Sequence, residues 1–228
     1  MRRFPLLLLP LALAALAAPA AGQRPEDYDY ENLAFSGLGV WLFGVAPAKA
    51  EVTPALHVRA DLGLLGPNVR ISPSLTYWST NIRDEEVDKI GERLAAACER
   101  AGSPCPGIAL GDVELSDLSI DVDAQYLFTT DFGIEPYLGI GAGIHLVNGS
   151  GDFIEDTFVE DVLDAITPGF NAMAGIEVPL GSSLRLQGEV RGVLASNARW
   201  AGLGIGASWT FPAAPRTAAP SGGAGGGR

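Results

Sequence analysis

Basic side chains are scarce in this sequence, which carries 15 Lys and Arg residues against 27 Asp and Glu residues. Binding to nucleic acid needs clustered lysines and arginines that face the phosphates, so the acidic balance argues against a nucleic-acid partner. The sequence also lacks a phosphate-binding loop, a nucleotide-binding fingerprint and a metal-ligand cluster. Its two histidines, His57 and His145, stand without a nucleophile motif. We therefore expect neither an enzyme nor a bound cofactor.

Long hydrophobic runs are missing after the first 22 residues. The opening stretch, MRRFPLLLLPLALAALAAPAAG, has two arginines, an apolar middle and a small-residue end, which is typical of a secretory signal peptide cleaved after Ala20 or Gly22. A retained membrane anchor is the less favoured alternative, because the run is short for spanning about 30 Å of hydrocarbon. We expect residues 1–22 to be removed on export, so that the mature protein starts outside the cytoplasm.

After an acidic segment at residues 23–32, apolar and polar residues alternate repeatedly with a period of two. In LRLQGEVRGVLAS, for example, Arg185, Gln187, Glu189 and Arg191 share one parity, while leucine, valine and glycine occupy the other. Such a period predicts β-strands whose two faces have different surroundings. Each segment has about the 9–11 residues needed to cross a bilayer at a tilt. Eight strands are expected, at residues 33–44, 50–63, 68–80, 113–128, 132–147, 167–179, 183–195 and 199–211.

Every expected strand has one parity without Asp, Glu, Lys or Arg, although the first strand is apolar on both. A soluble barrel of the lipocalin type, with its apolar face inside, would show the same period. Connection lengths favour a membrane barrel instead, because the second, fourth and sixth are tight whereas the third and fifth are long. Aromatic residues also gather near strand ends, where amphipathic rings favour the two membrane interfaces. The two expected belts are Trp41, Phe43, Tyr77, Trp78 and Trp200 at one rim, and Tyr126, Phe128, Phe132, Trp209 and Phe211 at the other.

A third feature favours the membrane barrel, namely the charge on the polar parity, which then faces the interior. Eight strands enclose a space only just wide enough for side chains, so arginines and carboxylates inside it can pair, as buried charges must. We expect a plugged rather than an open lumen, with both histidines in the same polar surroundings. The expected lumen charge network consists of Arg59, Asp61, Arg70, Asp121, Asp123, Glu135, Glu177, Arg185, Glu189 and Arg191.

Two segments carry a resemblance to a known family: PYLGIGAGIHL, and the last strand GLGIGASWTF, which ends on an aromatic residue. With the signal peptide, they resemble the small eight-stranded outer-membrane β-barrels, the group of the OmpA membrane domain, OmpX and OmpW-like proteins. The resemblance covers residues 33–211 and implies an all-β, antiparallel, up-and-down transmembrane barrel that meets outer-membrane lipid and the outer-membrane assembly machinery. Family barrels usually end on the terminal Phe. Here Phe211 is followed by residues 212–228, a Pro/Ala/Gly-rich tail that is expected to be disordered.

The third connection, an expected extracellular loop, includes the segment DEEVDKIGERLAAACER. Its apolar residues Val87, Ile90 and Leu94 recur at helical spacing behind an acidic first turn, which predicts a short helix lying over the barrel mouth. Cys98 and Cys105, the only cysteines, fall in the same loop. Export to an oxidising compartment favours a disulfide between them over two free thiols.

The fifth connection, GDFIEDTFVEDVLDA, has no basic residue, and Ile154, Phe158 and Val162 follow a helical spacing that suggests a second short helix. Carboxylates here could bind Ca²⁺ or Mg²⁺ that bridges anionic lipid, but their spacing lacks the pattern of an EF-hand loop. A solvated acidic face is the favoured interpretation. The carboxylates concerned are Asp152, Glu155, Asp156, Glu160, Asp161 and Asp164.

Proline disturbs the third expected strand at Pro73, where it removes a donor from the ladder. Because a closed barrel has no free edge to accommodate it, we expect a bulge or a shifted strand there.

Three classes of function stay open at this point. The leading one is a non-enzymatic outer-membrane barrel with a structural, adhesive or envelope-maintaining role and a largely closed lumen. The second is a narrow channel for small or apolar molecules. The third is a soluble secreted lipid-binding barrel of the lipocalin type.

Overall fold

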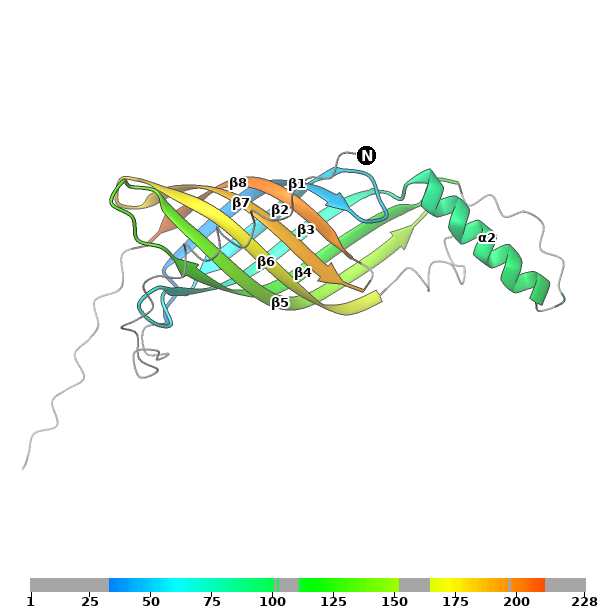
Figure 1. The fold of residues 1–228 in the computed structure, drawn as a ribbon, viewed down its shortest axis with the longest axis horizontal. Helices are drawn as coiled ribbons and strands as arrows, with labels where there is room; N and C mark the ends of the chain where they lie inside the picture. The colour runs from blue at the N-terminus through cyan, green and yellow to red at the C-terminus, as the bar shows by residue number, and fades with distance from the viewer. Residues whose placement is uncertain (1–32, 101, 103–110, 152–164, 197, 212–228) are drawn as a thin grey trace, which may run out of the picture.

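The chain forms a closed antiparallel barrel of eight strands in a computed structural model (Figure 1), which describes residues 33–100, 102, 111–151, 165–196 and 198–211. Each strand pairs with the next along the chain, and β8 pairs with β1 to close the ring. The expected up-and-down barrel is confirmed. The strands are β1 (Gly37–Pro47), β2 (Thr53–Asp61), β3 (Val69–Asn81), β4 (Glu114–Leu127), β5 (Glu135–Ser150), β6 (Ala165–Leu180), β7 (Leu184–Ala195) and β8 (Trp200–Thr210).

The two ends of the barrel differ in how the strands are joined. The turn end, at the left of Figure 1, carries the β2–β3, β4–β5 and β6–β7 connections and the start of β1. Gly133 and Gly181 lie in two of these turns with φ of 72 and 81, a left-handed conformation that glycine adopts without a Cβ clash. The loop end, on the opposite side, carries the remaining four connections, including the long β3–β4 and β5–β6 segments.

Helix α2 (Asp84–Arg100) follows β3 at the loop end. The predicted helix is therefore confirmed, and its acidic first turn and Arg100 in the last turn suit the helix dipole. Val87 and Ile90 pack against buried residues of the barrel. Beyond them the helix projects away from the barrel (Figure 1), so the expectation that it lies over the mouth is wrong. Among the described residues, no helix is long and apolar enough to span a bilayer.

The strands place polar residues inside the barrel and apolar residues outside. On β4, Asp121 and Asp123 are buried, whereas the alternating neighbours Ile120 and Val122 are 54% and 55% exposed. This alternation is the reverse of the one in a soluble barrel, where the apolar face is buried. The assignment of faces made from the sequence thus agrees with the structure, with one exception that concerns the aromatic residues.

Pro73 lies beside a β-bulge. The regular pairing of β2 with β3 runs from Trp78 back to Ser74, the residue that follows Pro73. It continues with the Leu62 N–H donating to the Ile71 carbonyl at 3.0 Å and the Ile71 N–H donating to the Gly63 carbonyl at 3.1 Å. Two consecutive residues therefore face one partner, which is the arrangement of a bulge. The bulge thus lies opposite Ile71, two residues from Pro73, and its extra residue is on the β2 side of the pair. Pro73 itself, where the bulge was expected, keeps a regular pairing with Val122 on β4.

Inward-facing glycines give the large interior side chains their space. A Cβ atom at Gly204 would lie 2.6 Å from the Phe43 ring, and one at Gly206 would overlap the Trp41 ring. By contrast, the outward-facing Gly192 on β7 has no atom within 4 Å of such a position. The glycines on the inward parity of β8 are therefore a packing requirement of the interior.

This contrast predicts that Gly206→Val destabilises the barrel whereas Gly192→Val does not. Overpacking a filled interior typically costs about 1–3 kcal/mol, and the same substitution on the outer wall adds only an exposed apolar side chain. The free energy of unfolding of the refolded protein in lipid vesicles measures both. Equal values for the two variants would contradict the packing described above.

Candidate functional site

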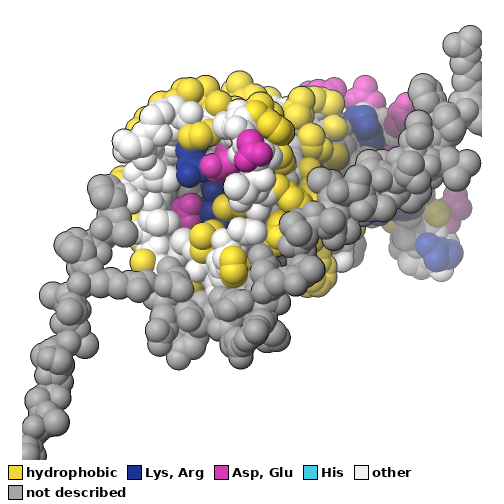
Figure 2. All heavy atoms as spheres, turned by 60° about the vertical axis from the view of Figure 1, so that its left-hand side comes forward, with side chains coloured by type: hydrophobic (Ala, Val, Ile, Leu, Met, Phe, Trp, Pro, Cys, Tyr) yellow, Lys and Arg dark blue, Asp and Glu magenta, His cyan; other side chains and the backbone are white. Residues whose placement is uncertain are grey.

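The interior of the barrel has two layers. The charged layer, toward the turn end, holds the arginines and most of the carboxylates; the apolar lid, toward the loop end, holds aromatic and aliphatic side chains. Figure 2 faces the turn end and shows Arg and carboxylate side chains inside a ring whose outer surface is largely hydrophobic. The apolar lid includes Trp41, Phe43, Val45, Trp78, Val147, Val193 and Trp200.

Glu189 on β7 joins two arginines in the charged layer. Its Oε2 accepts hydrogen bonds from Arg59 Nη2 and from the Tyr137 hydroxyl, both at 2.6 Å. Its Oε1 accepts from Arg191 Nε at 2.9 Å, and Arg191 Nη2 donates to Asp123 Oδ2 at 2.6 Å. All five side chains are buried. Two buried arginines are thus compensated by two buried carboxylates, as a low-dielectric interior requires.

Arg70 and Arg185 pair with the carboxylates nearer the turn end. Arg70 Nη2 bonds Glu177 Oε1, and Arg70 Nη1 lies 3.8 Å from Asp61 Oδ2. Arg185 Nη1 bonds Glu135 and lies 3.2 Å from the other oxygen of Glu177. The side chains of Arg185 and Glu135 are 28% and 36% exposed, so the charged layer meets solvent at this pair. Each arginine of the expected network therefore has a carboxylate partner.

Asp121 is the member of the expected network that lies apart from the arginines. It accepts hydrogen bonds from Ser119 Oγ at 2.9 Å and Asn171 Nδ2 at 3.1 Å, both neutral groups. Near it, His145 Nδ1 lies 2.9 Å from Asp117 Oδ2, a pair that sequence reasoning missed. Asp117 shares the parity of Asp121 on β4, and this signal could have identified it.

The pair of His145 and Asp117 does not form a hydrolytic site among the described residues. A histidine oriented by a carboxylate can activate a serine that lies within hydrogen-bond reach. Here Ser119 donates to Asp121 instead of bonding to His145. Both His145 and Asp117 are buried, with exposed fractions of 0% and 1%. The second histidine, His57, lies 2.8 Å from the Thr76 hydroxyl and is also buried.

The apolar lid corrects one prediction. Trp41, Phe43, Trp78 and Trp200 were expected in an aromatic belt at the membrane interface, but all four point inward and are at most 5% exposed. Trp41 and Phe43 pack against His57, with ring centroids 5.4 Å and 5.6 Å from it, and Trp200 packs against Phe43. The period of two could not assign Trp41 and Phe43, because β1 is apolar on both faces. Trp78 shares the parity of the buried Arg70 on β3, a signal that could have identified it as inward-facing.

The other aromatic residues of the two expected belts are not buried. Tyr77, from the same expected belt, is 49% exposed. At the turn end, Phe132, Trp209 and Phe211 of the second expected belt are 76%, 52% and 46% exposed. An outward aromatic belt therefore exists at the turn end, whereas most of the aromatic residues near the loop end fill the interior.

The interior leaves little free volume beside the charged layer. A cavity of about 10 Å³ is lined by Arg59, Ser72, Gln187 and other side chains. Buried atoms of these three residues lack a hydrogen-bond partner in the described part of the chain. A volume of about 10–15 Å³ holds one water molecule, so this cavity is suited to a single water and not to a solute.

The remaining expected sites fall wholly or partly outside the described residues. The carboxylates of residues 152–164 lie outside them, as does Cys105, so the cation site and the disulfide stay predictions. Within the described ranges, no three His, Cys, Asp or Glu side chains are arranged to hold a metal ion.

Comparisons of sequence find no protein-family model and no curated protein that match this chain. Comparison of structures finds similar barrels. Neisserial surface protein A has a TM-score of 0.50 and 13% identity, covering 78% of this chain and 96% of that chain. Ail, the attachment invasion locus protein of Yersinia pestis, has a TM-score of 0.44 and 10% identity, covering 78% and 97%. A major outer membrane protein of Thermus thermophilus has 0.44 and 11%, covering 77% and 99%.

These comparisons bear on the fold. The likeness to Neisserial surface protein A confirms the structural resemblance to small outer-membrane barrels that the sequence predicted.

Proposed function

We propose that this protein is an integral outer-membrane β-barrel with a closed lumen and a structural, adhesive or envelope-maintaining role. The observation that carries the proposal is the inverted distribution of side chains. Arg59, Glu189 and Arg191 are buried inside, while Ile140 and Ile205 on the outer wall are 71% and 72% exposed. Water would destabilise such an outer wall, whereas hydrocarbon suits it.

The closed lumen is supported by two barriers in series. A solute entering from the turn end meets the ion pairs that connect Arg185, Arg70, Arg59 and Arg191 to their carboxylates. Beyond them, it meets the apolar lid, in which Trp41, Phe43 and Trp200 fill the cross-section with rings. An eight-stranded barrel is only just wide enough for its own side chains, so both barriers favour a plug over a channel.

The soluble alternative requires the opposite arrangement. A lipocalin-type barrel binds its lipid in an apolar interior and exposes charges to water. Here the interior beside the turn end carries four arginines with their carboxylate partners. A lipid tail would have to displace these ion pairs, which makes this alternative the least favoured.

An orientation follows from the proposal. Tight turns of outer-membrane barrels face the periplasm and longer loops face the cell exterior, so the turn end is assigned to the periplasm. Helix α2 would then project from the cell surface, which supports a contact or adhesive role. An enzymatic role is less favoured, because His145 and Asp117 are buried.

Membrane fractionation tests the proposal. The protein expressed in a Gram-negative host should stay with the outer-membrane fraction after an alkaline carbonate wash, because the apolar wall holds it in lipid. A soluble periplasmic protein released by the same wash serves as the control. Release of the barrel into the supernatant would overturn the membrane assignment.

A further inference from the structure

Three cationic side chains meet at one edge of the loop end, and we name them the cationic rim: Lys49, Arg83 and Arg199. Backbone contacts hold their segments together. The Arg83 N–H donates to the Lys49 carbonyl at 3.1 Å, and the Ala48 N–H donates to the Arg199 carbonyl at 2.8 Å. The Arg83 guanidinium also bonds the Ala48 carbonyl. Three separate connections thus place their positive charges side by side.

The cationic rim is available to a ligand. All three residues are exposed, and no described carboxylate forms an ion pair with any of them. Glu86, in the acidic first turn of α2, pairs with Lys89 at 2.6 Å. The hydrogen bond from Lys89 lowers the pKa of the Glu86 carboxyl. The charges of Arg83 and Lys49 lower this pKa further, so Glu86 lies within electrostatic range of the rim. The three rim cations outnumber this one carboxylate, which already pairs with Lys89, and they lie next to the wall that the proposed function places in lipid.

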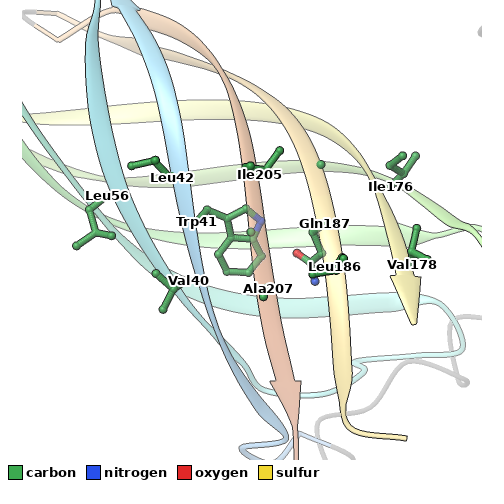
Figure 3. A pocket seen from close by; sticks show the side chains of 12 residues that line it. Val40, Trp41, Leu42, Leu56, Ile176, Val178, Leu186, Gln187, Ile205 and Ala207 are labelled. Carbon is green, nitrogen blue, oxygen red and sulfur yellow. The ribbon is translucent and has the colours of Figure 1, made fainter. Parts of the chain in front are cut away.

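A groove of about 650 Å³ crosses the outer wall below the rim. Figure 3 shows Leu42 and Leu56 on one side of it and Ile176 and Val178 on the other, with Leu186 and Ala207 between. Small residues form its floor, because Gly188 contributes no side chain and Ala207 only a methyl group. The groove is continuous with the exposed apolar wall of β1, β7 and β8.

Small outward-facing residues connect the groove with the rim along the β1–β8 seam. Ala46 pairs with Ala201, and Ala201 pairs with Gly192 on β7. Gly44 and Gly192 have no atom within 4 Å of the position that a Cβ would take. A ligand that reaches from the rim to the groove could therefore follow the β1 side of the seam, over Ala46 and Gly44. Leu203 of β8, which pairs with Gly44 and is 66% exposed, borders this path.

The separation of rim and groove matches one membrane leaflet. From Leu42 to Pro47, the last residue of β1, the strand rises about 3.3 Å per residue at a tilt of about 40°, which gives roughly 13 Å along the membrane normal, and Lys49 follows two residues later. Half of a hydrocarbon core of about 30 Å is roughly 15 Å. A lipid whose headgroup lies at the rim would thus reach the groove with the ends of its tails.

A second copy of the chain fits the groove less well than a lipid does. Under two-fold symmetry the same patch faces itself, so groove would face groove and leave a void between the barrels. A flexible acyl chain can follow the hollow, and association within lipid depends on such close packing.

We infer that the β1–β8 face binds one phosphate-bearing lipid of the outer leaflet, and this inference rests on the proposed function. Its phosphate lies against the cationic rim, where arginine and lysine donate charge-assisted hydrogen bonds. One of its tails lies along the seam and ends in the groove.

A pair of lipids with the same tails tests the inference. The purified protein in detergent micelles is mixed with dimyristoyl phosphatidic acid or with dimyristoyl glycerol, and bound lipid is counted by native mass spectrometry. Retention of the phosphate-bearing lipid should exceed that of the glycerol on the order of thirtyfold, because two surface cations at about 1 kcal/mol each contribute to it. Equal retention would overturn the inference. The proposed function would survive that result if the same protein still resists the carbonate wash.

Matched variants test separately how the headgroup and the tail contribute to lipid binding. Lys49→Gln with Arg199→Gln should abolish the preference for phosphate, whereas Arg93→Gln with Arg100→Gln removes the same charge from α2 and should leave it intact. Ala207→Leu fills the groove and should lower retention of both lipids severalfold, while Ala142→Leu, an exposed position on β5, should not. Protease resistance of each folded variant verifies the barrel. A preference unchanged by the rim variant, or retention unchanged by Ala207→Leu, would overturn the site.

Discussion

Glu189→Gln is expected to destabilise the barrel by about 3–5 kcal/mol, the cost of breaking a buried ion pair by removing one partner. Glu189 is the carboxylate that the described structure pairs with Arg59, at 2.6 Å, and Arg59 is 3% exposed. Glutamine keeps the size and a hydrogen-bonding oxygen but removes the charge. Arg59 would then be a buried cation without a counter-charge. Urea titration of the refolded protein in lipid vesicles measures the loss.

The double variant separates an ion pair from two independent residues. Arg59→Met combined with Glu189→Gln should cost clearly less than the sum of the single variants, because neither charge is left uncompensated. Glu86→Gln is the control, since its exposed pair with Lys89 contributes little to stability. Strictly additive losses for Arg59 and Glu189 would contradict the charged layer.

Ile140→Arg should cost about 2–4 kcal/mol in the same vesicles, because an arginine near the bilayer midplane of a barrel's outer wall is unfavourable. Ile140 lies in the middle of β5 and is 71% exposed. Asn148→Arg on the same face of the same strand is the matched control. It lies near the loop end, where the cost falls to about 0–1 kcal/mol. Equal losses at both positions would mean that this wall does not contact hydrocarbon.

The strands and their faces could be predicted from the sequence because a membrane barrel repeats one simple rule. Alternate residues face opposite sides, so the charged residues of β4 and β7 mark the inward parity of their strands. The tight turns between strands could also be predicted from the sequence. Arg185, Glu189 and Arg191 all point inward as their parity requires.

Which residues pair inside the barrel could not be predicted, because pairing depends on the stagger of the strands. Arg59 and Glu189 are 130 residues apart in sequence and meet across the lumen. Asp121 and Asp123 have the same parity on the same strand, yet Asp123 reaches Arg191 while Asp121 bonds Ser119 and Asn171. A shift of two residues along the strand decides this difference, and no local pattern encodes it.

The part of the apolar lid on β1 could not be predicted because hydrophobicity does not distinguish an inward ring from a lipid-facing one. Trp41 and Leu42 are both apolar neighbours on β1, but Trp41 is 2% exposed and Leu42 is 59% exposed. The glycines opposite the lid were a usable signal. Gly204 and Gly206 lie across from Phe43 and Trp41 in the β1–β8 register, and only a missing side chain leaves room for the rings.

Single-channel recording in a planar bilayer tests the central claim most directly, that this barrel spans a membrane and is sealed. The unmutated protein, inserted and verified by its protease-protected strands, should give no steady current above the leak of the bilayer. Ion pairs and apolar side chains fill this interior, and the cavity beside the charged layer, of about 10 Å³, is too small for a hydrated ion. A large, steady conductance from the unmutated barrel would contradict the sealed lumen and establish a channel instead.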